Sequence, residues 1–240
     1  MNPGCSWKAQ TWARPARQSA HADLNAVVVG DDVDPAGAAL LGCRFATSYR
    51  GLVDRAVLLP GEIVAVFGCG GVGLSAVMLA VARGARVLAV DVAPAALALA
   101  RASGAHEVLD IAGLDEDAVV AAVRSRFDGA PAVVVEALGR PSTLAIGLRS
   151  LASGGRLVQI GLLGASAEVP IGEVIARELT ILGSHGMAAA DYPRLLELVR
   201  SGGLHPESLV TRRIPIDDAP DALLALADGT AVGGVTMIGF

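Results

Sequence analysis

A short glycine-rich segment is the first candidate for chemistry in this chain. Residues 68–73 match the pattern G-x-G-x-x-G and read Gly68, Cys69, Gly70, Gly71, Val72 and Gly73. The pattern alone is weak, because glycine accounts for 29 of the 240 residues. Its context strengthens it, since the aliphatic run 63–67 stands directly before it and a helix is expected over 72–83. The segment therefore predicts a turn between a strand and a helix.

Such a turn has the chemistry of a phosphate site. Gly68 would allow the tight bend, Gly70 would let the backbone touch a pyrophosphate, and Gly73 would let the helix pack close to the strand. The first N–H groups of the helix, at the positive end of its dipole, would attract the phosphates. The loop thus predicts a dinucleotide site, and a glycine turn without a ligand is the alternative interpretation.

Asp91 is the second candidate, because it lies 18 residues beyond Gly73 (91 − 73) at the end of an expected strand. A carboxylate there can accept hydrogen bonds from both ribose hydroxyls of NAD and would repel the 2′-phosphate of NADP. The next four residues, 92–95, contain no Arg or Lys to hold such a phosphate. The position favours NAD. A helix-capping or turn role is the alternative, and the two roles are compatible.

Strands and helices are expected to alternate around these residues. We expect strands at 63–67, 86–90, 106–109, 131–135, 156–160 and 179–182, and helices at 72–83, 94–103, 115–127 and 141–151. Short alternation of this kind predicts an α/β Rossmann fold, a doubly wound parallel sheet with helices on both faces. Outside this region we expect a short strand at 23–29, helical parts within 35–57, helices at 191–200 and 218–227, an extended stretch at 214–216 and a final strand at 235–238.

Composition excludes several classes of protein. Hydrophobic residues make up 53% of the chain and aromatic residues only 3%, which suits an aliphatic layered core. The net charge of −5, without a basic block, argues against nucleic acid as a partner. Residues 63–82 carry no charge, but four glycines within them argue against a membrane helix. Three widely spaced cysteines predict neither disulfides nor a paired-cysteine zinc motif, and favour a reducing, cytoplasmic compartment.

Three motifs together resemble the zinc-dependent, medium-chain alcohol dehydrogenases. They are Gly42-Cys43-Arg44-Phe45-Ala46-Thr47-Ser48-Tyr49, then Pro60-Gly61-Glu62, then the glycine loop, and the resemblance runs from about His21 to the C-terminus. It implies NAD-dependent hydride transfer between a small alcohol and its aldehyde or ketone, with zinc polarising the alcohol. It also implies that strand 179–182 is a dimerisation edge, and hence a homodimer or tetramer.

The resemblance implies further site residues. Cys43 matches a catalytic zinc ligand, and Thr47 matches a threonine that lies against the nicotinamide. Ribose and nicotinamide contacts are implied for Ala137, Leu138, Ile160, Gly161 and Leu162. Backbone contacts to the carboxamide are implied for Ser184, His185 and Gly186.

The departures from the family concern the zinc. A catalytic zinc needs three protein ligands. The family's second cysteine, its histidine, its four-cysteine structural zinc site and its proton relay have no counterpart here, and they belong to a preceding GroES-like catalytic domain. Cys43 alone cannot close the site, and His185 or His21 could help only if the fold brought them near. We therefore expect no zinc on this chain, and a truncated dehydrogenase or, alternatively, a catalytically silent NAD-binding module.

The expected organisation follows from these motifs. Residues 1–20 would be a poorly ordered leader, 21–50 a remnant of the catalytic domain with a linker helix, 51–186 the Rossmann NAD-binding domain and 187–240 a C-terminal segment of the catalytic domain. We expect 21–42 and 187–240 to be less well packed than 60–184. Two other residues near the site have structural interpretations: Glu136 as a strand-end hydrogen-bond acceptor and Cys69 as a small packing residue.

Overall fold

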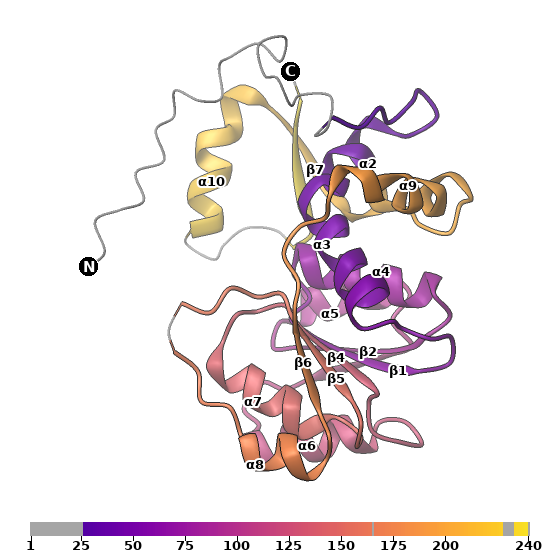
Figure 1. The fold of residues 1–240 in the computed structure, drawn as a ribbon. Helices are drawn as coiled ribbons and strands as arrows, with labels where there is room; N and C mark the ends of the chain where they lie inside the picture. The colour runs from indigo at the N-terminus through magenta and orange to yellow at the C-terminus, as the bar shows by residue number, and fades with distance from the viewer. Residues whose placement is uncertain (1–25, 165, 228–232, 240) are drawn as a thin grey trace, which may run out of the picture.

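The computed structural model describes residues 26–164, 166–227 and 233–239 (Figure 1). The predicted leader at 1–20 therefore lies outside the described residues, as does the beginning of the strand predicted at 23–29. For the residues that the structure describes, the prediction of this strand is wrong, because residues 26–30 have no strand structure. The carbonyl of Val29 accepts a hydrogen bond from the guanidinium of Arg200 at 2.8 Å instead of from a neighbouring strand.

A six-stranded, fully parallel sheet forms the centre of the fold, in the order β3-β2-β1-β4-β5-β6. Its strands are β1 (Ile63–Phe67), β2 (Arg86–Asp91), β3 (Glu107–Asp110), β4 (Val133–Glu136), β5 (Arg156–Gln159) and β6 (Thr180–Gly183). This strand order is that of the doubly wound Rossmann fold, so the predicted fold class is confirmed. The observed ends differ from the predicted ones by one or two residues, which is ordinary for strand boundaries.

Helices cover both faces of the sheet (Figure 1). Side chains alternate across each strand: Val64 and Val66 of β1 face the core that contains α4 (Gly71–Ala82) and α5 (Pro94–Ala102). Ala65 and Phe67 face the other core, which contains α6 (Glu116–Ser125) and α7 (Pro141–Ser150). A short helix, α8 (Ile171–Ala176), was not predicted, because six residues are too few for the spacing of apolar residues to distinguish a helix from a strand or loop.

A helical segment from 35 to 55 precedes the sheet and packs on the first core. It comprises α2 (Pro35–Leu40), a π-helical turn (Leu41–Phe45), α3 (Ala46–Tyr49) and a second π-helical turn (Arg50–Arg55). Asp34 caps its start by accepting hydrogen bonds from the N–H groups of Ala36 and Gly37. Phe45 and Leu52 are fully buried and anchor it to α4. The helical parts predicted within 35–57 are thereby confirmed.

The C-terminal segment adds α9 (Tyr192–Arg200), β7 (Val210–Pro215), α10 (Ala219–Ala227) and β8 (Val235–Gly239). β7 and β8 pair as a separate two-stranded parallel sheet, so the extended stretch begins well before the predicted residue 214. α9 buries Leu195 and Leu196 in the first core, whereas α10 exposes Leu223, Leu224 and Leu226. Among the described residues, no helix is both long and apolar enough to cross a bilayer.

Candidate functional site

The glycine loop lies between the end of β1 and the start of α4. Gly68 has a φ of +91°, a conformation that favours glycine. A Cβ added at Gly73 would lie 1.7 Å from the carbonyl oxygen of Gly68, so only glycine fits at this crossing of strand and helix. A Cβ added at Gly70 would meet nothing within 4 Å, which leaves that backbone open to a ligand. α4 has no side-chain cap, so its first N–H groups suit an anion.

Asp91, at the end of β2, holds the glycine loop in place. Its Oδ2 accepts a hydrogen bond from the Cys69 N–H at 2.7 Å. Its Oδ1 accepts from the N–H groups of Val92 and Ala93, at 2.7 and 2.9 Å, just before α5 begins. The turn-capping interpretation is therefore confirmed. A carboxylate has about four lone-pair positions, so acceptor capacity remains for a ribose hydroxyl.

A cavity of about 300 Å³ opens beside Asp91 on the side of α6 and α7. Its lining includes Val92, Ile111, Leu138 and Arg140, three of which the sequence analysis did not single out. Val92 and Ile111 follow the ends of β2 and β3, which pair in the sheet. In the sequence, the only signal for these two residues is that an apolar residue directly follows each strand. The strand order, which the sequence pattern does not reveal, brings them together.

A second cavity, of about 610 Å³, collects most of the residues implied by the family resemblance. It is lined by Gly42, Cys43, Thr47, Val72, Ala137, Leu138, Ile160, Gly161, Leu162, His185 and Gly186. Leu138 lines both cavities and also covers the glycine loop: a Cβ added at Gly68 would lie 2.6 Å from its Cγ. The two cavities therefore meet at this side chain.

Three hydrogen bonds fasten α3 to the rest of the site. Thr47, only 6% exposed, accepts at Oγ1 from the Gly186 N–H at 3.1 Å. The hydroxyl of Ser184 donates to the Thr47 carbonyl at 2.9 Å, and the hydroxyl of Ser48 donates to the Val72 carbonyl at 3.0 Å. The helix is thus tied both to the end of β6 and to the first turn of α4.

Glu136, at the end of β4, is fully buried and supports the segment that follows it. Its carboxylate accepts from the N–H groups of Leu138 and Gly139, from the hydroxyl of Thr143 and from the side-chain amide of Gln159. The predicted acceptor role is confirmed. With its lone pairs directed at these donors, Glu136 holds the segment after β4 in place.

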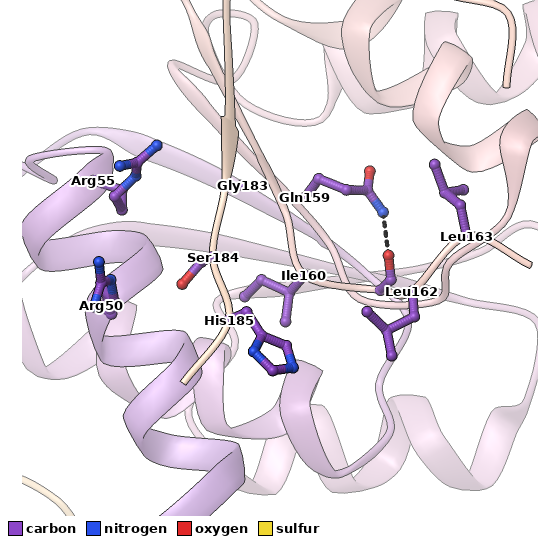
Figure 2. Close-up of a pocket in the computed structure, with 10 residues that line it drawn as sticks. Arg50, Arg55, Gln159, Ile160, Leu162, Leu163, Gly183, Ser184 and His185 are labelled. Atoms are coloured by element: carbon purple, nitrogen blue, oxygen red, sulfur yellow. Dashed lines mark hydrogen bonds between the residues drawn. The ribbon is translucent and has the colours of Figure 1, made fainter. Parts of the chain in front are cut away.

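Figure 2 shows the continuation of the site past His185, a cavity of about 460 Å³. Arg50 and Arg55 project into it from the helical turn after Tyr49, beside Gly183 and Ser184 at the end of β6. Ser184 therefore lies at this cavity, whereas His185 lines both this one and the 610 Å³ cavity.

The cysteines differ in their surroundings. Cys43 is exposed at the 610 Å³ cavity, which it shares with His185. Throughout residues 26–164, 166–227 and 233–239, no three His, Cys, Asp or Glu side chains cluster closely enough to hold a metal ion. The residues described do not fit a catalytic zinc, which needs three protein ligands. Cys69 is buried, and burial raises the pKa of its thiol to about 12, as expected for a packing residue.

The known proteins that this chain resembles include several dehydrogenases. A family model described as zinc-binding dehydrogenase matches residues 71–201. Geraniol dehydrogenase of Castellaniella defragrans is 32% identical over 216 residues, which are 88% of this chain and 57% of that protein. Alcohol dehydrogenase TADH from Thermus sp. ATN1 superposes with a TM-score of 0.79 at 31% identity, over 88% of this chain and 60% of that one.

Acetophenone reductase from Geotrichum candidum, solved in complex with NAD, superposes with a TM-score of 0.73 at 26% identity, over 88% of this chain and 58% of that one. The chain thus spans somewhat more than half the length of the relatives it matches.

Proposed function

Because the chain belongs to the zinc-type medium-chain alcohol dehydrogenase family, we propose that it binds NAD along the carboxyl edge of its sheet and serves hydride transfer between an alcohol and its aldehyde or ketone. One observation carries the proposal. Two cavities, of about 300 and 610 Å³, meet at Leu138 directly over the glycine loop. A dinucleotide has two ring systems joined by a pyrophosphate, and this arrangement offers two ring-sized spaces joined at a phosphate site.

The adenosine half belongs in the smaller cavity. Val92 and Leu138 are 57% and 43% exposed there, and such apolar side chains would cover the faces of an adenine ring. The Asp91 carboxylate would accept from the ribose hydroxyls with the lone pairs that its backbone bonds leave free. Its negative charge, with no Arg or Lys at 92–95, supports NAD rather than NADP.

The pyrophosphate belongs on the loop of Gly68, Gly70, Gly71, Val72 and Gly73. Gly70 leaves its backbone open, and the uncapped start of α4 supplies N–H donors and a positive partial charge.

The nicotinamide half belongs in the larger cavity. Bound there, NAD supplies the carbon that accepts the hydride. Thr47 and Val72 would support one side of the ring, while Ala137, Leu138 and the segment Ile160–Leu162 would exclude water from the other. Backbone groups of Ser184, His185 and Gly186 would hold the carboxamide. The hydrogen bonds from Gly186 and Ser184 to Thr47 keep these two walls together.

We propose the predicted organisation for the chain as a whole. Residues 51–186 are the NAD-binding domain, and 21–50 and 187–240 are the parts that belong with a GroES-like catalytic domain. The separate β7–β8 sheet and the exposed leucines of α10 support this division. Cys43 would supply one zinc ligand, and the described residues do not complete a three-ligand site around it.

The same observation supports a second candidate function, an NAD-binding module without turnover. Calorimetry with NAD and NADP, metal analysis and an assay of alcohol-dependent NADH formation, all on the purified chain, distinguish the two. NAD binding with zinc below a tenth of an equivalent and no NADH supports the silent module. Zinc near one equivalent with turnover supports the dehydrogenase. Absence of NAD binding in calorimetry overturns both.

A further inference from the structure

The side chain of Arg44 lies on the first residue of α4. Arg44 belongs to the π-helical turn Leu41–Phe45, which packs against that helix. A Cβ added at Gly71 would lie 2.6 Å from Arg44 Nε, 2.9 Å from Cδ and 3.0 Å from Cζ. The guanidinium thus reaches the glycine loop from outside it, and Gly71 is the residue that gives it room.

This position is electrostatically unfavourable for a cation by itself. The N-terminus of a helix carries a positive partial charge, which repels a guanidinium. The first turn of α4 contains no acidic residue and no side-chain cap that would offset the repulsion.

Arg44 also lacks partners that other half-buried arginines of the fold have. Its Nη1 is buried and has no hydrogen-bond acceptor among the described residues. By contrast, Arg156, whose Nε also lacks an acceptor, forms an ion pair with Glu62 through Nη2 at 2.6 Å, and Arg177 forms one with Glu173 at 2.9 Å. A buried donor without an acceptor costs about 1–3 kcal/mol, more when it is charged.

We propose that Arg44 is a ligand of the cofactor pyrophosphate. An anion on the glycine loop would satisfy both unfavourable features at once, because it attracts the helix N-terminus and the guanidinium and accepts the unpaired hydrogen bond. Arginine suits this role, since its planar fork binds two phosphate oxygens together. The inference rests on the proposed NAD site and adds a residue from outside the glycine loop to it.

The position of Arg44 in the chain extends its role. Thr47, proposed to support the nicotinamide, follows three residues later on the same helical segment and is fastened to Gly186 and Ser184. Binding of the pyrophosphate by Arg44 would therefore hold this segment against the cofactor. The contact should favour diphosphates over nucleosides, because only the diphosphate reaches the guanidinium.

Calorimetry with NAD, ADP-ribose, adenosine and inorganic pyrophosphate tests the proposal on wild type, Arg44→Gln, Arg44→Lys and Arg83→Gln. Arg83 lies exposed at the opposite end of α4, so its variant has the same charge change. We expect Arg44→Gln to weaken NAD, ADP-ribose and pyrophosphate binding about tenfold or more. Lysine should recover part of this loss, Arg83→Gln should change affinity less than twofold, and adenosine binding should be equal in all four proteins.

Thermal unfolding without ligand gives an independent measurement. Since the guanidinium is repelled by the helix end and lacks an acceptor, Arg44→Gln should unfold at a temperature equal to or above that of wild type. Wild-type NAD affinity in a folded Arg44→Gln protein would overturn the inference and leave the proposed function standing. Pyrophosphate binding that needs Arg44, without any NAD binding, would support the anion site and overturn the proposed function. If neither ligand bound wild type, both would fall.

Discussion

Asp91 accepts a hydrogen bond from the backbone N–H of Cys69 at 2.7 Å, which joins the end of β2 to the glycine loop. The residue proposed to bind the ribose therefore also shapes the phosphate site. A substitution at Asp91 should affect both halves of the cofactor and the stability of the loop.

Asp91→Asn should lower NAD affinity about tenfold or more and destabilise the fold by about 1–2 kcal/mol, because an acceptor for a charged hydrogen bond is lost. Asp110 is a matched control: it pairs with Asp91 in the sheet register and caps its own turn through Ala112, but it has no bond to the glycine loop. Calorimetry and urea unfolding check both variants. Equal NAD affinity in Asp91→Asn and Asp110→Asn would contradict the ribose assignment.

Substitutions at Gly73 and Gly70 should affect stability and NAD binding differently. Gly73→Ala would put a methyl group 1.7 Å from the Gly68 carbonyl oxygen, and should cost about 1–3 kcal/mol or more of stability together with NAD binding. Gly70→Ala meets open space, so its stability should stay within about 0.5 kcal/mol of wild type. It should still weaken NAD binding, because the methyl occupies the approach of the pyrophosphate. A Gly70→Ala protein that binds NAD normally would argue against this loop as the phosphate site.

Glu136 should be required for stability. Glu136→Gln replaces one carboxylate oxygen by a donor, which would face either the donors of Leu138, Gly139 and Thr143 at Oε1 or those of Gly139 and Gln159 at Oε2. We expect a loss of about 3 kcal/mol, since a buried network loses acceptors it cannot replace. Thr143→Val, which removes a single donor, should cost about 1 kcal/mol. Urea unfolding measures both, and a smaller loss for Glu136→Gln than for Thr143→Val would be the contrary result.

The buried thiol of Cys69 should give stability a dependence on alkaline pH. Burial raises its folded-state pKa from 9.0 to about 12, so the folded state retains a proton that the unfolded state releases. This contribution to stability is complete below about pH 9 and is lost as pH rises toward 12. Cys69→Ala should therefore show a shallower decline of unfolding free energy above pH 9 than wild type. Parallel declines would contradict this assignment.

The edge of the sheet at β6, which pairs with no further strand among the described residues, should mediate self-association. β6 is the last strand in the sheet order, and Ile181 on it is 41% exposed. Ile181→Lys should shift a dimer or tetramer toward monomer in analytical ultracentrifugation, because a charge on an edge strand opposes pairing. Leu114→Lys, also exposed but beyond β3 at the opposite end of the strand order, should leave the oligomer unchanged. Identical sedimentation of wild type and Ile181→Lys would exclude this interface.

Strand positions could be predicted because aliphatic runs, bounded by glycine and proline, mark buried parallel strands. The stretch 26–29 has the same aliphatic composition, yet it forms no strand, because it takes a side-chain partner in Arg200 instead of a neighbouring strand. Composition does not reveal which backbone groups will pair. The length of β7 was underestimated for the opposite reason: its polar residues Arg212 and Arg213 pair with β8 although both are exposed.

The site was predicted best where a motif fixes the backbone. The glycine loop and Asp91 depend on local geometry, and both lie as expected. Ile111 and Arg140 line a cavity with Asp91 only because β3, β2, β1 and β4 are neighbours, which is a property of the strand order. No role was predicted for Arg44, although it belongs to the motif at 42–49, because the direction of its side chain toward Gly71 depends on how two helices pack.

The hydrogen bonds of Ser48, Thr47 and Ser184 should make one side of the larger cavity more rigid than the rest. The wall at α3 is held by three hydrogen bonds at Thr47 and Ser48, to Val72 on one side and to Ser184 and Gly186 on the other. Another part of the lining ends in Leu162, a residue that is 79% exposed and makes no comparable hydrogen bond among those described. When ligands of different size bind, the loop after β5 should therefore change its conformation, while the side of the cavity that contains Thr47 should keep its position.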